Sequence, residues 1–197
     1  MKNVNLCPMI IVGIDPGAGG GIAIHDGTVA TCAPLEAGPR WLYNLLMEKK
    51  AAGGDFIVLI EKVGLHLAEM KSDQNSAEGA QISGKSSPAI IFRLQTMIAS
   101  SVQAYTVVQL CGLPVCWVQP RSWQAFLGLG RIPGESDTQR KGRYRAYAAQ
   151  TYPGLHVTLK TQDAVCLMEF GRRKWKIEPA WFNGKLVKPD DPVLTLF

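Results

Sequence analysis

The sequence lacks the features that would place the protein in a membrane or outside a cell. No apolar stretch approaches the roughly 20 residues that a bilayer-spanning helix needs. Residues 1–6 lead almost directly into an apolar segment, without the pattern of a secretory signal. We therefore expect a cytoplasmic protein with no membrane partner.

Cysteine and histidine are too few and too scattered for a disulfide framework or a zinc site. The five cysteines have no framework spacing, and Cys111 and Cys116 lack the second pair that a zinc site needs. The three histidines form no metalloprotease or catalytic-triad pattern. Internal repeats and low-complexity tracts are also absent. With 197 residues, of which 47% are hydrophobic, the chain is long enough for one α/β core and short for two.

The most informative feature present is a pair of apolar runs that each end in a carboxylate. Residues 10–14 lead into Asp15 and a glycine-rich turn, and residues 56–60 lead into Glu61. If the two runs are neighbouring parallel strands, their ends lie about 5 Å apart and the two acids converge. Such a pair is costly unless a cation lies between them, and a divalent metal is the usual solution.

Hydrophobic periodicity along the rest of the chain predicts alternating strands and helices. From residue 175 onward we expect an extended tail on the surface or on a partner, so residues 1–174 form the predicted domain and residues 175–197 an extension. The other predicted elements are strands at 22–24, 28–32 and 113–118, helices starting at 38 and covering 88–110, 123–127, 139–150 and 161–170, and a polar loop over 63–87.

A third acid, Asp163, lies in the first turn of the last predicted helix, where backbone NH groups favour its ionised form. Each acid also has a plain structural reading: Asp163 as a helix cap, Asp15 as a turn former and Glu61 as a solvated strand end. The order of elements is more informative. A strand meander, a helix, a strand ending in an acid and a late helix beginning with an acid resemble the ribonuclease H-like nuclease superfamily.

Four segments in the right order are similar to RuvC-type Holliday-junction resolvases, particularly the phage-borne branch. They are residues 13–17 (GIDPG), 60–63 (IEKV), 118–128 (VQPRSWQAFLG) and 163–173 (DA followed by EFGRR). The resemblance covers about residues 10–174. It implies an α/β, ribonuclease H-like fold with a mixed five-stranded sheet flanked by helices. It also implies that Asp15, Glu61 and Asp163 hold two magnesium ions, replaceable by manganese, beside the scissile phosphate.

The resemblance further implies a metal-dependent endonuclease that resolves four-way DNA junctions by paired, symmetric nicks. A homodimer would place two sites on the twofold axis of the junction, with residues 88–110 as the candidate interface. If the protein is phage-encoded, it acts in the cytoplasm of the bacterial host. Two alternatives remain open: a broader nuclease for branched DNA such as forks and flaps, and a catalytically weak junction-binding protein.

The second alternative is motivated by Lys160, where the family generally places an Asp or His ligand. A protonated lysine cannot bind a metal, but it can neutralise the phosphate or orient the water, and we count Lys160 as a candidate catalytic residue. Otherwise the fourth ligand comes from Glu169, Asp190 or Asp191.

Positive charge is concentrated in the C-terminal half of this chain of net charge +5, as expected for a protein that binds phosphate backbones. A solvated helix face is the other explanation for these charges. In the loop over 63–87, His66, Met70 and Gln74 could touch unstacked bases, or have no such role. The candidate DNA-binding residues are Lys62, Lys85, Arg121, Arg140, Lys141, Arg143, Arg172 and Arg173.

Two nucleotide-binding patterns fail on their context. Residues 79–86 match the P-loop pattern, but polar residues precede them instead of a buried strand. The Asp-Pro-Gly turn with its glycines is also found in actin-like and sugar kinases, which need two such domains, and this chain is too short for them.

Overall fold

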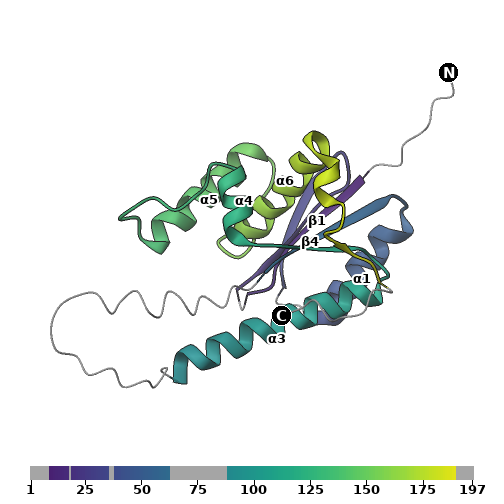
Figure 1. The fold of residues 1–197 in the computed structure, drawn as a ribbon, viewed down its shortest axis with the longest axis horizontal. Helices are drawn as coiled ribbons and strands as arrows, with labels where there is room; N and C mark the ends of the chain where they lie inside the picture. The colour runs from purple at the N-terminus through teal and green to yellow at the C-terminus, as the bar shows by residue number, and fades with distance from the viewer. Residues whose placement is uncertain (1–8, 18, 36–37, 63–87, 190–197) are drawn as a thin grey trace.

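The structure is a computed structural model that describes residues 9–17, 19–35, 38–62 and 88–189 (Figure 1). Six strands form a single sheet in the order β3-β2-β1-β4-β5-β6. Their bounds are β1 (Met9–Asp15), β2 (Gly21–His25), β3 (Ala30–Pro34), β4 (Asp55–Glu61), β5 (Val115–Val118) and β6 (Leu186–Val187).

The sheet is mixed, and its register brings two acids to one edge. Strands β1, β2 and β3 pair antiparallel, whereas β1, β4 and β5 run parallel. Ile14 pairs with Ile60, so Asp15 and Glu61 leave neighbouring strands side by side. This arrangement confirms the predicted α/β fold, a mixed sheet flanked by helices. The predicted number of five strands is wrong, because β6 adds a sixth, antiparallel to β5.

Helices cover both faces of the sheet (Figure 1). Alternate residues of each strand therefore enter one of two cores; in β1, Ile10 and Val12 join the core under α1 and α3, and Ile11 joins the core under α6. On the first face lie α1 (Gly38–Ala51) and α3 (Pro88–Leu110), and on the second lie α4 (Pro120–Phe126), α5 (Asp137–Thr151) and α6 (Gln162–Ile177).

Helix α6 packs unusually close to the centre of the sheet because β1 has a glycine under it. A Cβ atom on Gly13 would lie 2.4 Å from the carbonyl oxygen of Ala164 and 2.5 Å from the backbone nitrogen of Met168. All residues of α6 from Ala164 to Gly171 are buried. The start of α6 is thereby held against the end of β1.

The C-terminal segment folds back onto the domain. Helix α6 continues to Ile177, so the predicted end of this helix at residue 170 is too early and the predicted boundary at 174 lies inside it. The 3-10 turn η3 (Pro179–Phe182) then places Phe182 in the core with 1% of its surface exposed, and β6 extends the sheet. The expected extended tail is therefore wrong for residues 175–187.

The predicted loop over 63–87, with Lys85 and the P-loop-like residues 79–86, lies outside the described residues, as do Asp190 and Asp191. In the part of the chain that the structure describes, no helix is both long and apolar enough to cross a membrane.

Candidate active site

The three predicted acids line one cavity of about 650 Å³. Asp15 is the last residue of β1 and Glu61 the last residue of β4, and Asp163 lies in the first turn of α6. The first two meet because their strands are parallel neighbours, and the third joins them because α6 packs closely over Gly13.

Two of the acids are held by hydrogen bonds from the protein. The backbone NH of Gly17 donates to Oδ1 of Asp15 over 3.2 Å. The indole Nε1 of Trp123, on α4, donates to Oε2 of Glu61 over 3.3 Å. Trp123 is buried and lies edge-on to the ring of Tyr144, on α5, with 5.2 Å between the ring centroids. Helices α4 and α5 therefore fix the orientation of Glu61.

The ionised forms of the three carboxyl groups are destabilised by burial and by one another. Burial raises the pKa of Asp15, although the NH of Gly17 and the charge of Lys141 oppose this. Burial, followed by the charges of Asp15 and Asp163, raises the pKa of Glu61 well above its ordinary value. Burial and Asp15 raise the pKa of Asp163 to about 7. The three groups thus favour the uptake of positive charge, as protons or as a cation.

The donor set fits a hard divalent cation such as Mg²⁺. Oδ1 of Asp163 is buried without a hydrogen-bond partner among the described residues. Buried polar atoms normally have a partner, so this oxygen is available to coordinate a cation. Over the same residues, no group of three or more His, Cys, Asp or Glu side chains could by itself hold a metal ion. Mg²⁺ in enzymes usually combines one or two carboxylates with waters and substrate phosphates. The site therefore suits a cation that is bound jointly by the carboxylates and the substrate, and not one that is enclosed by protein ligands alone.

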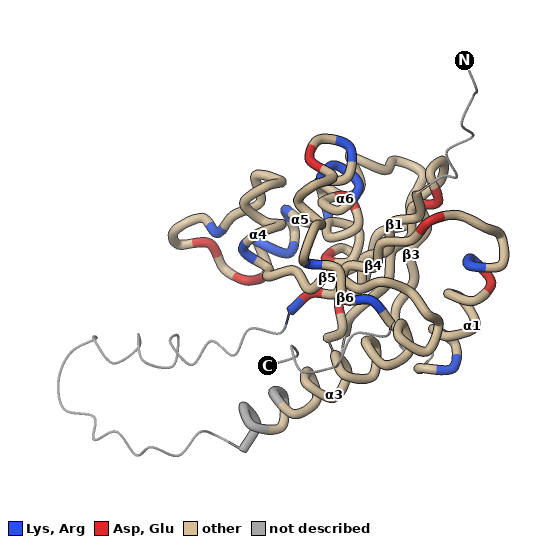
Figure 2. The backbone as a smooth tube through the Cα atoms, turned by 45° about the vertical axis from the view of Figure 1, so that its right-hand side comes forward, with Lys and Arg blue, Asp and Glu red and all other residues tan. Residues whose placement is uncertain are grey.

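Five cationic side chains line the same cavity as the acids: Lys62, Arg121, Arg131, Arg140 and Lys141. Figure 2 shows basic residues gathered around α4 and α5, near the acids at the strand ends. Lys141 and Arg140 lower the pKa of Asp163, against the larger effect of its burial. Cations beside paired carboxylates suit a phosphodiester, which needs positive charge around it.

Helix α5 is anchored where it presents these cations. Ser136 and Gln139 form a capping box at its start. Arg143, a predicted DNA-binding residue, instead donates to Glu135 over 2.5 and 2.7 Å and to the carbonyl oxygen of Gly130 over 2.9 Å. Arg143 thus holds the loop before α5, and it is not among the residues that line the cavity.

Arg172 and Arg173 are also engaged away from the cavity. Both donate to Glu169, which is fully buried, over 2.5 to 2.8 Å, and the hydroxyl of Tyr152 donates to it over 2.5 Å. Burial raises the pKa of Glu169, but these hydrogen bonds outweigh it and hold the pKa below its usual value. Glu169 is therefore a buried partner of arginines, and the structure does not bring it to the other acids.

Lys160 is exposed in the turn before α6, and it does not line the cavity. Its backbone packs against the start of β2, where a Cβ atom on Gly21 would lie 2.6 Å from the carbonyl oxygen of Lys160. Lys160 is therefore close to Asp163 along the chain, but its side chain is not among those that line the acid cavity.

Three residues that shape the cavity were not predicted from the sequence: Trp123, Arg131 and Tyr144. The roles of Trp123 and Tyr144 depend on which helix faces β4, and a single sequence does not show that. Arg131 lies in an irregular loop without a motif. For Trp123 a signal existed, because it belongs to the VQPRSWQAFLG segment on which the family resemblance depends.

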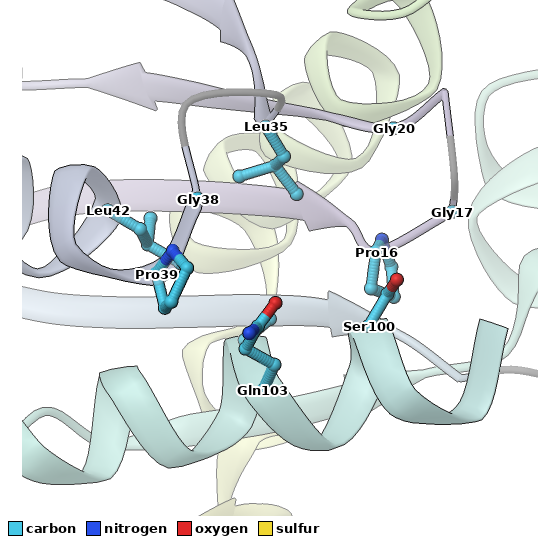
Figure 3. A pocket seen from close by; sticks show the side chains of 10 residues that line it. Pro16, Gly17, Gly20, Leu35, Gly38, Pro39, Leu42, Ser100 and Gln103 are labelled. Carbon is cyan, nitrogen blue, oxygen red and sulfur yellow. The ribbon is translucent and has the colours of Figure 1, made fainter. Parts of the chain in front are cut away.

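A second cavity, of about 120 Å³, lies behind the turn that follows Asp15. Ser100 and Gln103 point from α3 toward Pro16 and Pro39 (Figure 3). No charged side chain lines it among the described residues. We interpret it as a packing space where α3 supports the turn that carries Asp15.

No family model and no curated protein matches this sequence. Among solved structures, the chain is similar to "T. thermophilus RuvC in complex with Holliday junction substrate", with 10% identity, a TM-score of 0.47 and coverage of 86% of this chain and 97% of that chain. It is similar to "Thermus thermophilus RuvC structure" with the same identity and TM-score, over 91% of this chain and 99% of that chain. These likenesses concern the fold, and the site is assigned from its own residues.

Proposed function

We propose that the protein is a metal-dependent, structure-selective DNA endonuclease that resolves four-way junctions by paired, symmetric nicks. The observation that carries the proposal is the combination of three strained carboxylates and five cationic side chains in one cavity. The acids favour a divalent cation, and the cations favour a phosphodiester. The preference for junctions rests on the four sequence segments similar to RuvC-type resolvases.

Each group in the cavity has a distinct part in this reaction. Asp15, Glu61 and Asp163 would hold Mg²⁺ or Mn²⁺, which lowers the pKa of the attacking water and stabilises charge on the leaving oxygen. Trp123 keeps Glu61 oriented through its hydrogen bond. Arg140, together with Lys141, attracts the phosphodiester into the cavity and offsets the repulsion among the acids.

We further propose a homodimer formed through α3. This helix buries Tyr105 and Val108 against the sheet, and it exposes Phe92, Val102 and Leu110 by 69%, 42% and 70%. Exposed apolar side chains on a long helix suit an isologous contact with a second copy. Two sites related by a twofold axis would match the symmetry of a four-way junction.

Cleavage of a labelled synthetic four-way junction, a Y-fork and a linear duplex, each with Mg²⁺, Mn²⁺ or EDTA, tests the proposal. We expect metal-dependent, paired nicks confined to the junction. Asp15→Asn should abolish cleavage and keep junction binding, because it removes a buried negative charge near the phosphate. The matched control is Asp55→Asn at the other end of β4, which should cleave normally. Unchanged cleavage by Asp15→Asn would contradict the site assignment.

The same assay separates the two alternative functions. Equal cutting of forks and junctions would favour the broader nuclease for branched DNA. Tight binding without cuts would favour the junction-binding protein. Lys160→Asp should raise activity or lower the magnesium requirement if a missing ligand limits catalysis, whereas a collapse of activity would show that the lysine has its own catalytic role.

A further inference from the structure

The folded-back C-terminal segment forms one side of a separate groove, of about 370 Å³, on the other side of α4 from the acids. Lys185 follows η3, and it closes the groove together with Trp181. None of the residues that line this groove lines the acid cavity. Its principal side chains are Ser122, Phe126, Phe170, Lys174, Trp181 and Lys185.

Three aromatic rings form the floor of the groove. Phe170, buried on α6, lies edge-on to both Phe126 and Trp181, with 5.3 Å between ring centroids in each pair. Trp181 in turn lies edge-on to Phe182 at 5.0 Å. Interlocked rings of this kind are rigid, so the floor presents fixed positions to whatever lies above it.

Two lysines are held over this floor by the rings. Nζ of Lys185 lies 3.7 Å from the centroid of Trp181, and Nζ of Lys174 lies 5.7 Å from the same centroid and 4.8 Å from that of Phe126. A ring face attracts an ammonium group but leaves N–H donors free for an anion. Lys174 is shared with Glu178 at 2.7 Å, whereas Lys185 has no ion pair within the described part of the chain. The groove therefore carries two positive charges, of which that of Lys174 is partly neutralised by Glu178.

Helix α4 lines both the groove and the acid cavity. Arg121 and Gln124 of this helix line the cavity, and Ser122 and Phe126 line the groove. A helix is about 10 Å across, and one DNA strand advances about 3.4 Å per nucleotide. A strand therefore needs about three nucleotides to pass from one site to the other.

We propose that this groove binds the sugar–phosphate backbone of a DNA arm that leaves the acid cavity. The inference rests on the proposed function, and it gives the C-terminal segment a role in substrate binding. Lys185 contacts a phosphate directly. Lys174 attracts the phosphate more weakly, because Glu178 partly neutralises its charge.

The test is the binding of a labelled four-way junction to the full chain, measured by fluorescence anisotropy in EDTA over a series of salt concentrations. Lys185→Gln should raise the Kd about three- to tenfold and reduce the salt dependence by about one phosphate contact. Lys176→Gln, an exposed lysine of α6 outside the groove, is the matched control and should change the Kd by less than about twofold.

A second variant acts in the opposite direction, so misfolding cannot mimic it. Glu178→Gln removes the carboxylate that shares Lys174 and should lower the Kd about threefold. Glu48→Gln, an exposed acid on α1, controls for the general effect of net charge. If Lys185→Gln and Glu178→Gln behave like their controls, the groove does not bind DNA and the inference is wrong.

Cleavage of saturating junction distinguishes failure of this inference from failure of the proposed function. The groove variants should cleave at the wild-type rate once the DNA is saturating. A wild-type protein that never cleaves, but whose binding depends on Lys185, would overturn the nuclease and keep the groove. A protein that cleaves junctions and binds them independently of Lys185 would overturn the groove alone.

Discussion

Replacing Asp163 with asparagine removes a charge that the fold holds unfavourably, so we expect the variant to resist unfolding better than the wild type at pH 8. Burial, with the charge of Asp15, raises the pKa of Asp163 from 3.8 to about 7. Each pKa unit corresponds to about 1.4 kcal/mol, so the ionised side chain destabilises the fold by about 4 kcal/mol above pH 7. The buried amide costs about 1 to 2 kcal/mol of its own. A net gain of about 2 to 3 kcal/mol remains.

The pH dependence of this gain has a definite direction. Because the folded pKa lies above the unfolded one, the wild type suffers no penalty below about pH 4, where Asp163 is protonated in both states. The penalty grows between pH 4 and pH 7 and is complete above pH 7. The advantage of Asp163→Asn should therefore be largest at pH 8 and should shrink by more than half at pH 5.

Urea unfolding at pH 5, 6, 7 and 8, in EDTA, measures this difference. Asp137→Asn is the matched control, since Asp137 is 82% exposed and pairs with Arg140. It should cost no more than about 0.5 kcal/mol at any of these pH values. If Asp163→Asn is no more stable than the wild type at pH 8, or if its advantage is equal at pH 5 and pH 8, then the ionised Asp163 does not destabilise the fold.

Three other substitutions test how the fold supports the site. Trp123→Phe keeps an aromatic ring but loses the hydrogen bond to Glu61, so kcat for junction cleavage should fall about tenfold, and the smaller ring at this buried position should also lower the free energy of unfolding by about 1 to 3 kcal/mol. Gly13→Ala places a Cβ atom against the backbone of α6, and thermal unfolding should show a loss of about 3 kcal/mol together with lost activity. Glu169→Gln removes the buried charge that pairs with two partly exposed arginines and should cost about 1 to 2 kcal/mol in the free energy of unfolding. The folded variant should still cleave, which a variant that lost a metal ligand would not do.

The convergence of Asp15 and Glu61 could be predicted because it depends only on local pattern and strand adjacency. Two buried strands that each end in an acid bring these acids together whenever the strands pair in parallel and in register, as β1 and β4 do. The position of Asp163 beside the other two acids could not be predicted in the same way. Its position in the first turn of a helix is visible in the sequence, but its approach to β1 depends on Gly13, which leaves room for the α6 backbone.

The partners of the basic residues were harder to foresee. Arg172 and Arg173 were predicted to bind DNA from their charge alone. Their spacing of three and four residues from Glu169 is the spacing of helical ion pairs, so the sequence did contain a signal for their engagement. The return of Trp181 and Phe182 to the core carried no such signal, because two aromatics between prolines and glycines have no periodicity.

Helix α6 explains how the fold tolerates an unfavourable site. Asp163 at its start is destabilising when ionised, so something else must hold the helix in place. Glycines on both sides of the contact allow the closest packing: a Cβ atom on Gly171 would lie 2.5 Å from Leu59, as one on Gly13 would meet the helix backbone. Six residues beyond Asp163, the buried carboxylate of Glu169 accepts a hydrogen bond from the hydroxyl of Tyr152, the residue that follows α5, and so ties α6 to the neighbouring helix. The position of the third carboxylate is therefore set by helix-to-sheet packing and not by a loop, which is why substitutions within that contact should affect stability and catalysis together.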